Sequence, residues 1–351
     1  MNELKAKTSK NDTSGASPVY SALIVVTCYQ SASTIESCID GLNSQTRNDF
    51  FVAIVDNGDN DSSNLQSLSL PANMVVLTPG ENAGFAGGSN FGAMNSPVPN
   101  THDWVITVNP DAVLAPDWFE TLMQAASDFP NYSLLSTTLL KADAPEIIEG
   151  ASDFFSPYGI AKSRYADMNY QDFMELDHPS DVFECFAPCG AVAAYRREDF
   201  ERVSGFDESF FCYLEDIDIA FRLHFLGKKA LHVKAAKAYH VGGGSSPANQ
   251  ETAFTKAYHS QQNQIRLLLK HTPFLVGLFI WPCFILATVW ILIRSKGQAQ
   301  HNIRLKALRE IGDILPDVKK QRKVIQSSRK LSNLGFSKSL EWNLAKVMKR
   351  N

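Results

Sequence analysis

Residues 104–111 read WVITVNPD, five uncharged and mostly apolar residues followed by a polar turn. Short runs of this kind, rich in β-branched residues, are typical of strands buried on both faces of a sheet. Comparable runs occur at residues 20–27, 51–55, 74–77, 190–195 and 230–233. Segments with helical spacing of apolar residues occur at 33–42, 85–94, 116–126 and 198–203. This alternation predicts an α/β fold with a mostly parallel central sheet and helices on both faces.

Polar clusters follow three of these strands, at residues 27–30, 56–62 and 109–111. In open α/β sheets, ligands bind beyond the carboxyl ends of the strands. Because the polar clusters coincide with strand ends, we predict that the binding site lies at the carboxyl ends of these strands. The irregular, acidic and aromatic stretch at 141–184 is expected to form either an acceptor-side loop or an irregular connection.

The net charge of −4 conceals an asymmetry. Residues 1–293 carry 18 Lys and Arg against 33 Asp and Glu, whereas residues 294–351 carry 15 against 4. A basic tail after an acidic body suggests a nearby anionic surface, either phospholipid or nucleic acid. No nucleic-acid-binding motif is recognised, so we expect no nucleic-acid partner.

The six cysteines indicate reduced thiols in a cytoplasmic protein. Cys185 and Cys189 lie four apart, but no second pair at zinc spacing accompanies them. Residues 1–17 are polar and lack periodicity, which predicts a disordered leader rather than an apolar signal segment.

Residues 274–293 contain no charge over a length that can span a bilayer. Pro282 suggests a kink, or a re-entrant or interfacial helix pair, and Trp281 and Trp290 suit interfacial depth. A membrane span, an interfacial helix and a buried core helix are the three interpretations. Residues 302–351 are basic and have an amphipathic helical pattern, which suits an anionic membrane surface. We expect an α/β domain at 18–270 and a helical, membrane-associating extension at 271–351.

Asp111 is a candidate metal ligand, because it follows a buried strand in a turn built by Pro110. The alternative is that Asp111 caps the helix expected near Pro116. His240 precedes a run of glycines and serines, and its imidazole could be a further ligand. A lone His is more often structural, and the run at 242–246 suggests a loop that closes over a ligand.

The segment Glu215-Asp216-Ile217-Asp218 places three carboxylates within one helical turn. Like charges this close raise the pKa of each other, which suits a base that works near neutral pH. The alternative is a solvated helix N-terminus, but the flanking residues are too apolar for one. Asp216 is the predicted base. Arg222 is expected either to pair with one of these carboxylates or to face a diphosphate.

Two further segments are candidates for contacts with a nucleotide. Asp56 could accept a hydrogen bond from a base imide N–H, although an ordinary Asx turn explains it equally well. The glycine-rich segment 82–90 enters a helix and would let the backbone approach a phosphate or a ribose. It matches neither a Walker loop nor a dinucleotide fingerprint.

Taken in order over residues 22–246, these motifs resemble a known family. The matches are Val55-Asp56-Asn57 with Asp59 and Ser62, Asn82-x-Gly84-Phe85-Ala86-Gly87-Gly88-x-Asn90, Asn109-Pro110-Asp111, the block from Gly205 to Arg222, and His240 before its glycine-serine run. The chain resembles family 2 inverting glycosyltransferases with the GT-A fold, close to bacterial rhamnosyltransferases of O-antigen or capsule synthesis.

The resemblance implies roles for individual residues. Thr27, Tyr29 and Asp56 would contact the nucleoside. Asp111 and His240 would bind Mg²⁺ or Mn²⁺, and Asp216 would deprotonate the acceptor hydroxyl. The other expected donor-binding residues are Asn82, Gly84, Gly88, Asn90, Asn109 and Arg222. The metal-binding motif of the family is often Asp-x-Asp, whereas Asn109 takes the first position here. This difference favours the rhamnosyltransferase-like branch of the family. It also leaves fewer carboxylates for the metal.

The expected reaction moves a sugar, with dTDP-L-rhamnose the favoured donor, to a saccharide or polyprenyl-diphosphate-linked acceptor. The expected setting is the cytoplasmic face of the inner membrane, and a homo-oligomer is compatible with the sequence. The alternatives are a galactofuranosyl- or other hexosyltransferase that uses a UDP-sugar, and a non-catalytic nucleotide-sugar-binding subunit of a membrane assembly complex.

Overall fold

The structure is a computed structural model that describes residues 20–58, 65, 68–98, 102–176, 181–241 and 250–348. Some features predicted from the sequence lie outside the described residues: the leader at 1–17, Asp59 and Ser62 of the family motif, and the glycine-serine run at 242–246.

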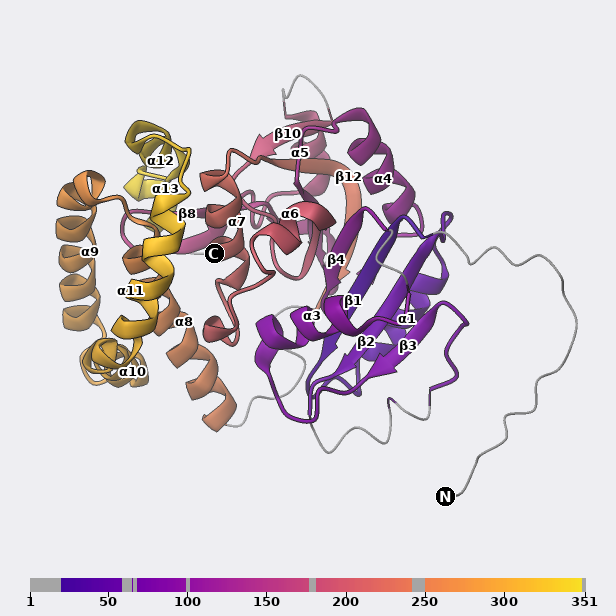
Figure 1. Cartoon of the computed structure of the whole chain (residues 1–351), viewed down its shortest axis with the longest axis horizontal. Helices are drawn as coiled ribbons and strands as arrows, with labels where there is room; N and C mark the ends of the chain where they lie inside the picture. Colours follow the sequence, from indigo (N-terminus) through magenta and orange to yellow (C-terminus); the bar gives the residue numbers. More distant parts are fainter. Residues whose placement is uncertain are drawn as a thin grey trace, which may run out of the picture.

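A ten-stranded sheet forms the centre of the molecule (Figure 1). Its strands run in the order β10-β12-β6-β11-β4-β1-β2-β3, with β5 paired to β12 and β7 to β6, and most neighbours along the main path are parallel. The strands are β1 (Ala22–Cys28), β2 (Phe50–Asp56), β3 (Met74–Leu77), β4 (Trp104–Val108), β5 (Ala112–Leu114), β6 (Leu134–Lys141), β7 (Ala144–Ala151), β10 (Val182–Cys185), β11 (Val192–Arg196) and β12 (Ala230–His240). The mixed α/β class predicted from the alternating runs is confirmed.

Both faces of the sheet are covered, which explains why its strands are continuous apolar runs. Ile24 and Val26 of β1 join the core under α1 (Ile35–Asn43) and α4 (Trp118–Asp128). Leu23 and Val25 face the opposite core, which contains α3 (Gly84–Asn95), α6 (Arg197–Arg202) and α7 (Glu215–Phe225). Successive residues of one strand thus serve two cores, as the period of two requires.

The segment at 141–184 is more regular than the sequence suggested. It contains β7, β8 (Asp153–Phe155), β9 (Ala161–Ser163), α5 (Tyr170–Glu175) and β10. The register of β7 against β6 shifts twice, so its alternation of buried and exposed residues is broken and was not recognised in the sequence. Strand β12 also continues past the predicted 230–233 to His240, with an irregularity between Val233 and Lys237.

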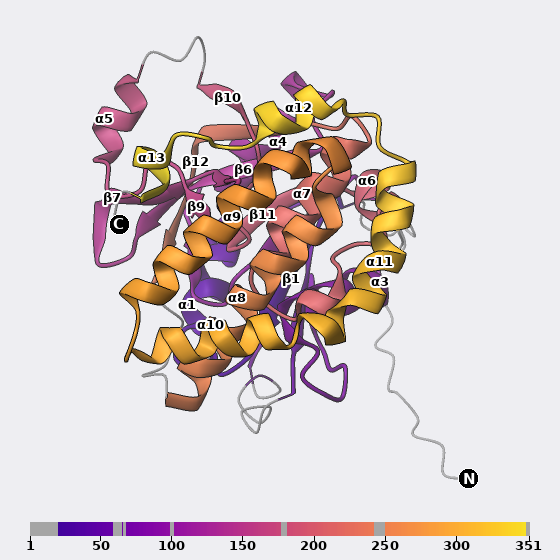
Figure 2. The same cartoon turned by 90° about the vertical axis from the view of Figure 1, so that its left-hand side faces the viewer.

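The C-terminal helices form a layer beside the sheet (Figures 1 and 2). They are α8 (Gln250–His271), α9 (Phe274–Arg294), α10 (Ala299–Arg309), α11 (Ile311–Ser327), α12 (Asn333–Ser339) and α13 (Leu344–Met348). Helix α8 packs against both α10 and α11. Arg322 of α11 donates to the carbonyl oxygens of Leu269 and Lys270, which fastens the extension to the end of α8.

Helix α8 also holds the loop that precedes α7. The side-chain amide nitrogen of Asn263 lies 2.9–3.0 Å from the carbonyl oxygens of Phe210, Cys212 and Tyr213. Three residues of this loop, Phe211, Tyr213 and Leu214, have positive φ angles of 60–70°. Such backbone is costly for residues other than glycine and persists only where its surroundings hold it.

We predict that Asn263→Ala destabilises the protein by about 2 kcal/mol, because buried carbonyl oxygens lose their donor. Chemical denaturation of the purified chain measures the free energy of unfolding. Asn302→Ala is the control, since Asn302 is exposed on α10 and its loss should change stability by less than about 0.5 kcal/mol. Equal effects of the two substitutions would contradict a role for Asn263 in holding the loop.

Candidate active site

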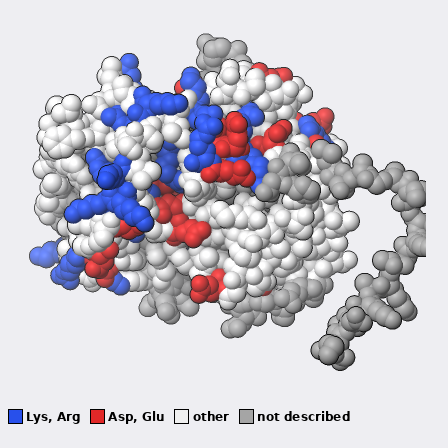
Figure 3. Space-filling model, viewed as in Figure 1, with Lys and Arg blue, Asp and Glu red and all other residues white. Residues whose placement is uncertain are grey.

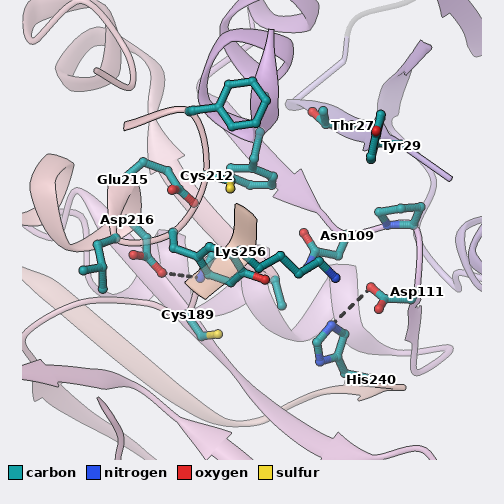
Figure 4. Close-up of a pocket in the computed structure, with 18 of the residues that line it drawn as sticks. Thr27, Tyr29, Asn109, Asp111, Cys189, Cys212, Glu215, Asp216, His240 and Lys256 are labelled. Carbon is teal, nitrogen blue, oxygen red and sulfur yellow. Dashed lines mark hydrogen bonds and ion pairs between the residues drawn. The ribbon is translucent and has the colours of Figure 1, made fainter. Parts of the chain in front are cut away.

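A pocket of about 960 Å³ opens at the carboxyl ends of the parallel strands (Figure 4). It collects residues that are far apart in the chain: Thr27 of β1, Asn109 to Asp111 after β4, Glu149 of β7, Glu215 and Asp216 of α7, His240 of β12 and Lys256 of α8. The polar clusters at strand ends therefore mark a pocket edge, because parallel strands end on the same side of a sheet.

The end of β4 and the end of β12 bring Asp111 and His240 together. Residue Ala112 pairs with His240 across the β5–β12 ladder, and the backbone N–H of Val241 donates to the carbonyl oxygen of Asp111. The Nε2 atom of His240 lies 3.2 Å from Oδ1 of Asp111. Helix α4 begins only at Trp118, after Asp117, so the alternative that Asp111 caps this helix is wrong.

A second carboxylate, Glu149, accepts a hydrogen bond from Nδ1 of His240 at 2.7 Å. Burial by itself lowers the pKa of His240, but the contacts with Asp111 and Glu149 outweigh it and raise this pKa to about 9. Burial likewise raises the pKa of Asp111, yet the contact with His240 leaves that pKa below its usual range. His240 therefore lies between two carboxylates, those of Asp111 and Glu149.

The pair of Asp111 and His240 fits a divalent cation in its chemistry. A carboxylate oxygen and an imidazole nitrogen are usual ligands, and Nε2 of His240 is buried without a hydrogen bond of good geometry. In the part of the chain that the structure describes, no group of three or more His, Cys, Asp or Glu is arranged to hold a metal ion. Two protein ligands suit a cation whose remaining ligands come from a bound substrate, as is common for Mg²⁺.

Asp216 lies in the pocket wall opposite Asp111 and His240 (Figure 4). Its Oδ2 accepts from the backbone N–H of Gly190 at 2.9 Å, and its Oδ1 accepts from that of Ile217 at 2.7 Å. Gly190 admits this contact, because a Cβ there would lie 3.1 Å from Oδ2. The two backbone donors hold the carboxylate in one orientation.

Burial raises the pKa of Asp216. Burial also raises the pKa of Glu215, and the neighbouring charge of Asp216 adds to that shift. Glu215 lines the pocket, and its Oε2 has no hydrogen-bond partner among the described residues. Like charges in the same turn, from which the sequence predicts a raised pKa for Asp216, are not its main cause, because desolvation dominates.

Asp218, the third carboxylate of this turn, points away from the pocket. It is fully buried and contacts Lys270 at 2.6 Å, Arg222 at 2.7 Å and His271 at 2.7 Å. These groups outweigh burial and hold the pKa of Asp218 well below its usual value. Arg222 donates further to the carbonyl oxygens of Val203 and Gly205, so it pairs with a carboxylate and does not line the pocket.

The other predicted donor-binding residues divide into two groups. Thr27, Tyr29, Asn82, Gly84 and Asn109 line the pocket. Asp56, Gly88 and Asn90 are buried outside the pocket lining. The residue that reaches the pocket from the end of β2 is instead Asn57, whose side chain donates to Asn82 Oδ1 and to the carbonyl oxygen of Gly84.

The glycine-rich segment proves largely a packing motif. A Cβ on Gly88 would lie 2.5 Å from Cγ2 of Thr27, so α3 approaches β1 closely. The side chain of Asn90 donates to the carbonyl oxygen of Phe206 and accepts from its N–H, which ties α3 to the segment before α7. Gly84 has φ of +69°, and a Cβ there would lie 2.3 Å from the carbonyl oxygen of Phe211.

Four charged pocket residues were not singled out in the sequence: Glu149, Asp153, Lys162 and Lys256. Asp153 lies at the start of β8, accepts from Ser163 Oγ at 2.5 Å, and faces the charge of Asp216. Burial, followed by the charge of Asp216, raises the pKa of Asp153 to about 7. The acidic content of 141–184 was a signal for Glu149 and Asp153, whereas no local pattern marks Lys256.

The fold has counterparts among solved structures. The structure is similar to the crystal structure of GalNAc-T7 with UDP, GalNAc and Mn²⁺, with a TM-score of 0.55 and 15% identity over 72% of this chain and 48% of that one. This likeness supports the GT-A-like fold, a mixed α/β fold with a mostly parallel central sheet.

Residues 23–204 match the model of the family described as glycosyl transferase family 2, and the chain belongs to this family. It is 26% identical over 265 residues to the N-acetylglucosaminyl-diphospho-decaprenol L-rhamnosyltransferase of Mycobacterium tuberculosis, covering 71% of this chain and 84% of that protein. It is also 26% identical over 169 residues to rhamnosyltransferase WbbL of Escherichia coli, covering 46% and 59%. The predicted family and enzyme class are confirmed.

The raised pKa of Asp153 predicts a pH dependence of stability. A carboxyl whose pKa is about 7 in the folded chain and about 3.8 unfolded binds more protons when folded. Its contribution to stability is therefore present below pH ~4 and is lost as pH rises to ~7. We expect Asp153→Asn to be more stable than the unmodified chain at pH 8, and this difference to vanish near pH 4, as measured by denaturation at each pH.

The exposed substitution Asp128→Asn is the control and should show no such trend, because Asp128 lies on the solvent side of α4. A difference between Asp153→Asn and the unmodified chain that stays constant from pH 4 to pH 8 would contradict the shifted pKa.

Proposed function

We propose that this glycosyltransferase transfers L-rhamnose from dTDP-L-rhamnose, with inversion, to a saccharide or polyprenyl-diphosphate-linked acceptor in bacterial surface polysaccharide synthesis. The observation that carries the proposal is a single pocket in which Asp216 faces the pair Asp111 and His240. The relatives named as rhamnosyltransferases support the sugar, and the diphospho-decaprenol in the name of one of them supports the acceptor class. A UDP-sugar hexosyltransferase is the alternative within the same chemistry.

In this proposal Asp216 accepts the proton of the acceptor hydroxyl as its oxygen attacks the anomeric carbon of the donor. The bond from that carbon to the diphosphate oxygen breaks with inversion, and the nucleoside diphosphate leaves. Burial suits Asp216 to this role, because a raised pKa brings its basicity closer to neutral pH. The backbone donors at Gly190 and Ile217 hold the carboxylate in place while the proton moves.

The leaving diphosphate needs positive charge. Asp111 and His240 would hold Mg²⁺ or Mn²⁺, which when bound neutralises charge on the diphosphate. Lys256 supplies a further cation from α8, and its charge reaches Asp111, because it helps to lower the pKa of that carboxyl. Thr27, Tyr29 and Asn57 line the pocket at the ends of β1 and β2 and would bind the nucleoside.

The proposed setting is the cytoplasmic face of the inner membrane, where a polyprenyl-linked acceptor resides. The presence of both Asp111 and Asp216 in one pocket supports an enzyme over a non-catalytic nucleotide-sugar-binding subunit. No role in binding nucleic acid is proposed for the basic tail, and assembly of the chain into a homo-oligomer is compatible with this function.

A thermal-shift panel tests the donor directly. We expect dTDP-L-rhamnose with Mn²⁺ to raise the melting temperature more than UDP-galactose, UDP-galactofuranose or GDP-mannose, since a ligand stabilises the folded state that binds it. Asp111→Asn should reduce the shift and its dependence on Mn²⁺. A larger rise in melting temperature with a UDP-sugar would show that this UDP-sugar, and not dTDP-L-rhamnose, is the donor. No rise with any nucleotide sugar would overturn the proposal.

Asp216→Asn tests the base. We expect a loss of turnover of roughly 10²- to 10⁴-fold, because proton transfer by a positioned base contributes this much. Donor binding, measured by the same thermal shift, should persist, because the amide keeps the shape of the carboxylate. Glu215→Gln is the matched comparison on the next residue. Full activity of Asp216→Asn together with inactivity of Glu215→Gln would transfer the role to Glu215.

Lys256→Gln tests the second cation. We expect a lower kcat with a folded protein, since positive charge next to the leaving diphosphate is lost. Lys256→Arg should recover part of the activity, because it restores the charge with a different shape. The control Lys237→Gln removes a lysine that lies outside the pocket lining. An equal kcat for Lys256→Gln and the unmodified chain would exclude Lys256 from the reaction.

A further inference from the structure

Helix α9 presents an apolar stripe to solvent along its whole length. Its exposed residues recur every three or four positions, as one face of a helix requires. Apart from Arg294 at the end of the helix, they are Phe274, Leu275, Leu278, Phe279, Pro282, Ile285, Leu286, Val289, Trp290 and Ile293, all apolar or aromatic. The side chain of Phe274 is 79% exposed and that of Ile293 is 71% exposed. A soluble protein rarely exposes so large a continuous apolar patch without a partner.

The opposite face of α9 is fixed to the body of the protein. Val276, Ile280 and Phe284 are buried in the same core as α7 and α8. Phe284 packs onto the turn at Gly159, where an added Cβ would lie 2.7 Å from its ring. The orientation of the exposed stripe is therefore set by packing. The interpretation of α9 as a buried core helix is wrong, since its buried residues are only Val276, Gly277, Ile280, Phe284 and Thr288.

The arrangement of neighbouring helices favours a helix that lies in the plane of a membrane surface. Figure 2 shows α9 running across one face of the molecule, with α10, α11 and α12 around it. Helix α9 contacts α10 and α12. If α9 crossed the bilayer, the polar body attached along its inner face would have to enter the hydrocarbon, which is costly. An in-plane helix buries the stripe and leaves the body in water.

Basic residues accompany the stripe. Figure 3 shows Lys and Arg gathered over the part of the molecule that contains the C-terminal helices. The exposed cations that follow the stripe in the chain are Arg294, Lys296, Lys306, Arg309, Lys319, Lys320 and Lys323. Between residues 294 and 323, all of which the structure describes, the exposed acidic residues are Asp313 and Asp317. The guanidinium of Arg294 lies 5.0 Å from the ring of Trp290, an amphipathic pair suited to the headgroup level.

We propose that the exposed face of α9 is a monotopic docking surface for an anionic lipid bilayer, with the helix lying in the plane of the headgroup region. The apolar stripe enters the acyl boundary, and the cations after it contact anionic headgroups. A second copy of the chain is a poorer occupant, because it would bring two basic regions together.

This inference gives the membrane partner of the proposed function a location and an orientation, but it does not depend on the sugar reaction. Vesicle sedimentation with the full chain tests it without any nucleotide sugar. We expect binding to vesicles containing phosphatidylglycerol, and binding at least 10-fold weaker to pure phosphatidylcholine. Equal binding to both would overturn the anionic preference, and binding to neither would overturn the docking surface.

Paired variants locate the surface. The double substitution Leu278→Glu with Leu286→Glu places two charges in the stripe and should weaken binding to the anionic vesicles at least 10-fold. Met94→Glu is the matched control, because Met94 is 65% exposed on α3, close to the 61% of Leu278, and lies outside the C-terminal layer. The thermal shift with nucleotide sugars should be the same in all three proteins. Equal weakening by Met94→Glu would overturn the assignment to α9.

Depth measurement separates an in-plane helix from a crossing one. Leu275→Cys, Leu286→Cys and Ile293→Cys carry a fluorescent label at the start, middle and end of the stripe, and the unsubstituted chain corrects for native thiols such as Cys283. Brominated lipids should quench the three labels at similar depths. A middle label far deeper than the end labels would show a crossing helix. A lipid-free dimer that the double Glu variant abolishes would assign the stripe to a second copy.

Discussion

The buried carboxylate of Asp218 holds together the parts of the chain that build the active site. Lys270 and His271 reach it from the end of α8, and Arg222 reaches it from one turn further along α7. Such a charge is stable without water only when it is fully paired. Lys270 also contacts Asp207, which lies before the loop of positive φ angles. These ion pairs around Asp218 thus fix α7, and with it Asp216, relative to the C-terminal layer.

Three carboxylates in one helical turn serve different purposes because their surroundings differ. Asp218 faces cations, and its pKa is lowered. Glu215 and Asp216 face the pocket, where burial raises the pKa of both. Only Asp216 has its two oxygens held by backbone N–H groups, from Gly190 and Ile217. A carboxylate that is desolvated yet fixed in orientation is a better proton acceptor than a mobile one, which favours Asp216 over Glu215.

The sequence predicted the sheet and the pocket edge because both follow from local patterns. Strand β4 was predicted at its observed bounds, because the polar residues Asp103 and Asn109 stand directly before and after its uncharged run and mark where a buried strand must begin and end. Asp111 lines the pocket as predicted, because it follows the well-defined end of this strand. Motif residues were harder to assign, because a glycine or amide can serve packing as well as ligands. Gly88 and Asn90 join α3 to β1 and to Phe206, and a sequence pattern alone does not separate that purpose from donor contact.

What the sequence could not supply depends on contacts between distant segments. Glu149 approaches His240 across 91 residues, a proximity that arises from the pairing of β6 with both β7 and β12. The same holds for α9, whose composition is apolar on every side and therefore fits a span, a core helix or a surface helix equally. Only the packing of Ile280 and Phe284 against the core selects which face remains outside. Attachment along the length of the helix, rather than its hydropathy, is therefore the property that distinguishes a helix lying on a membrane from one that crosses it.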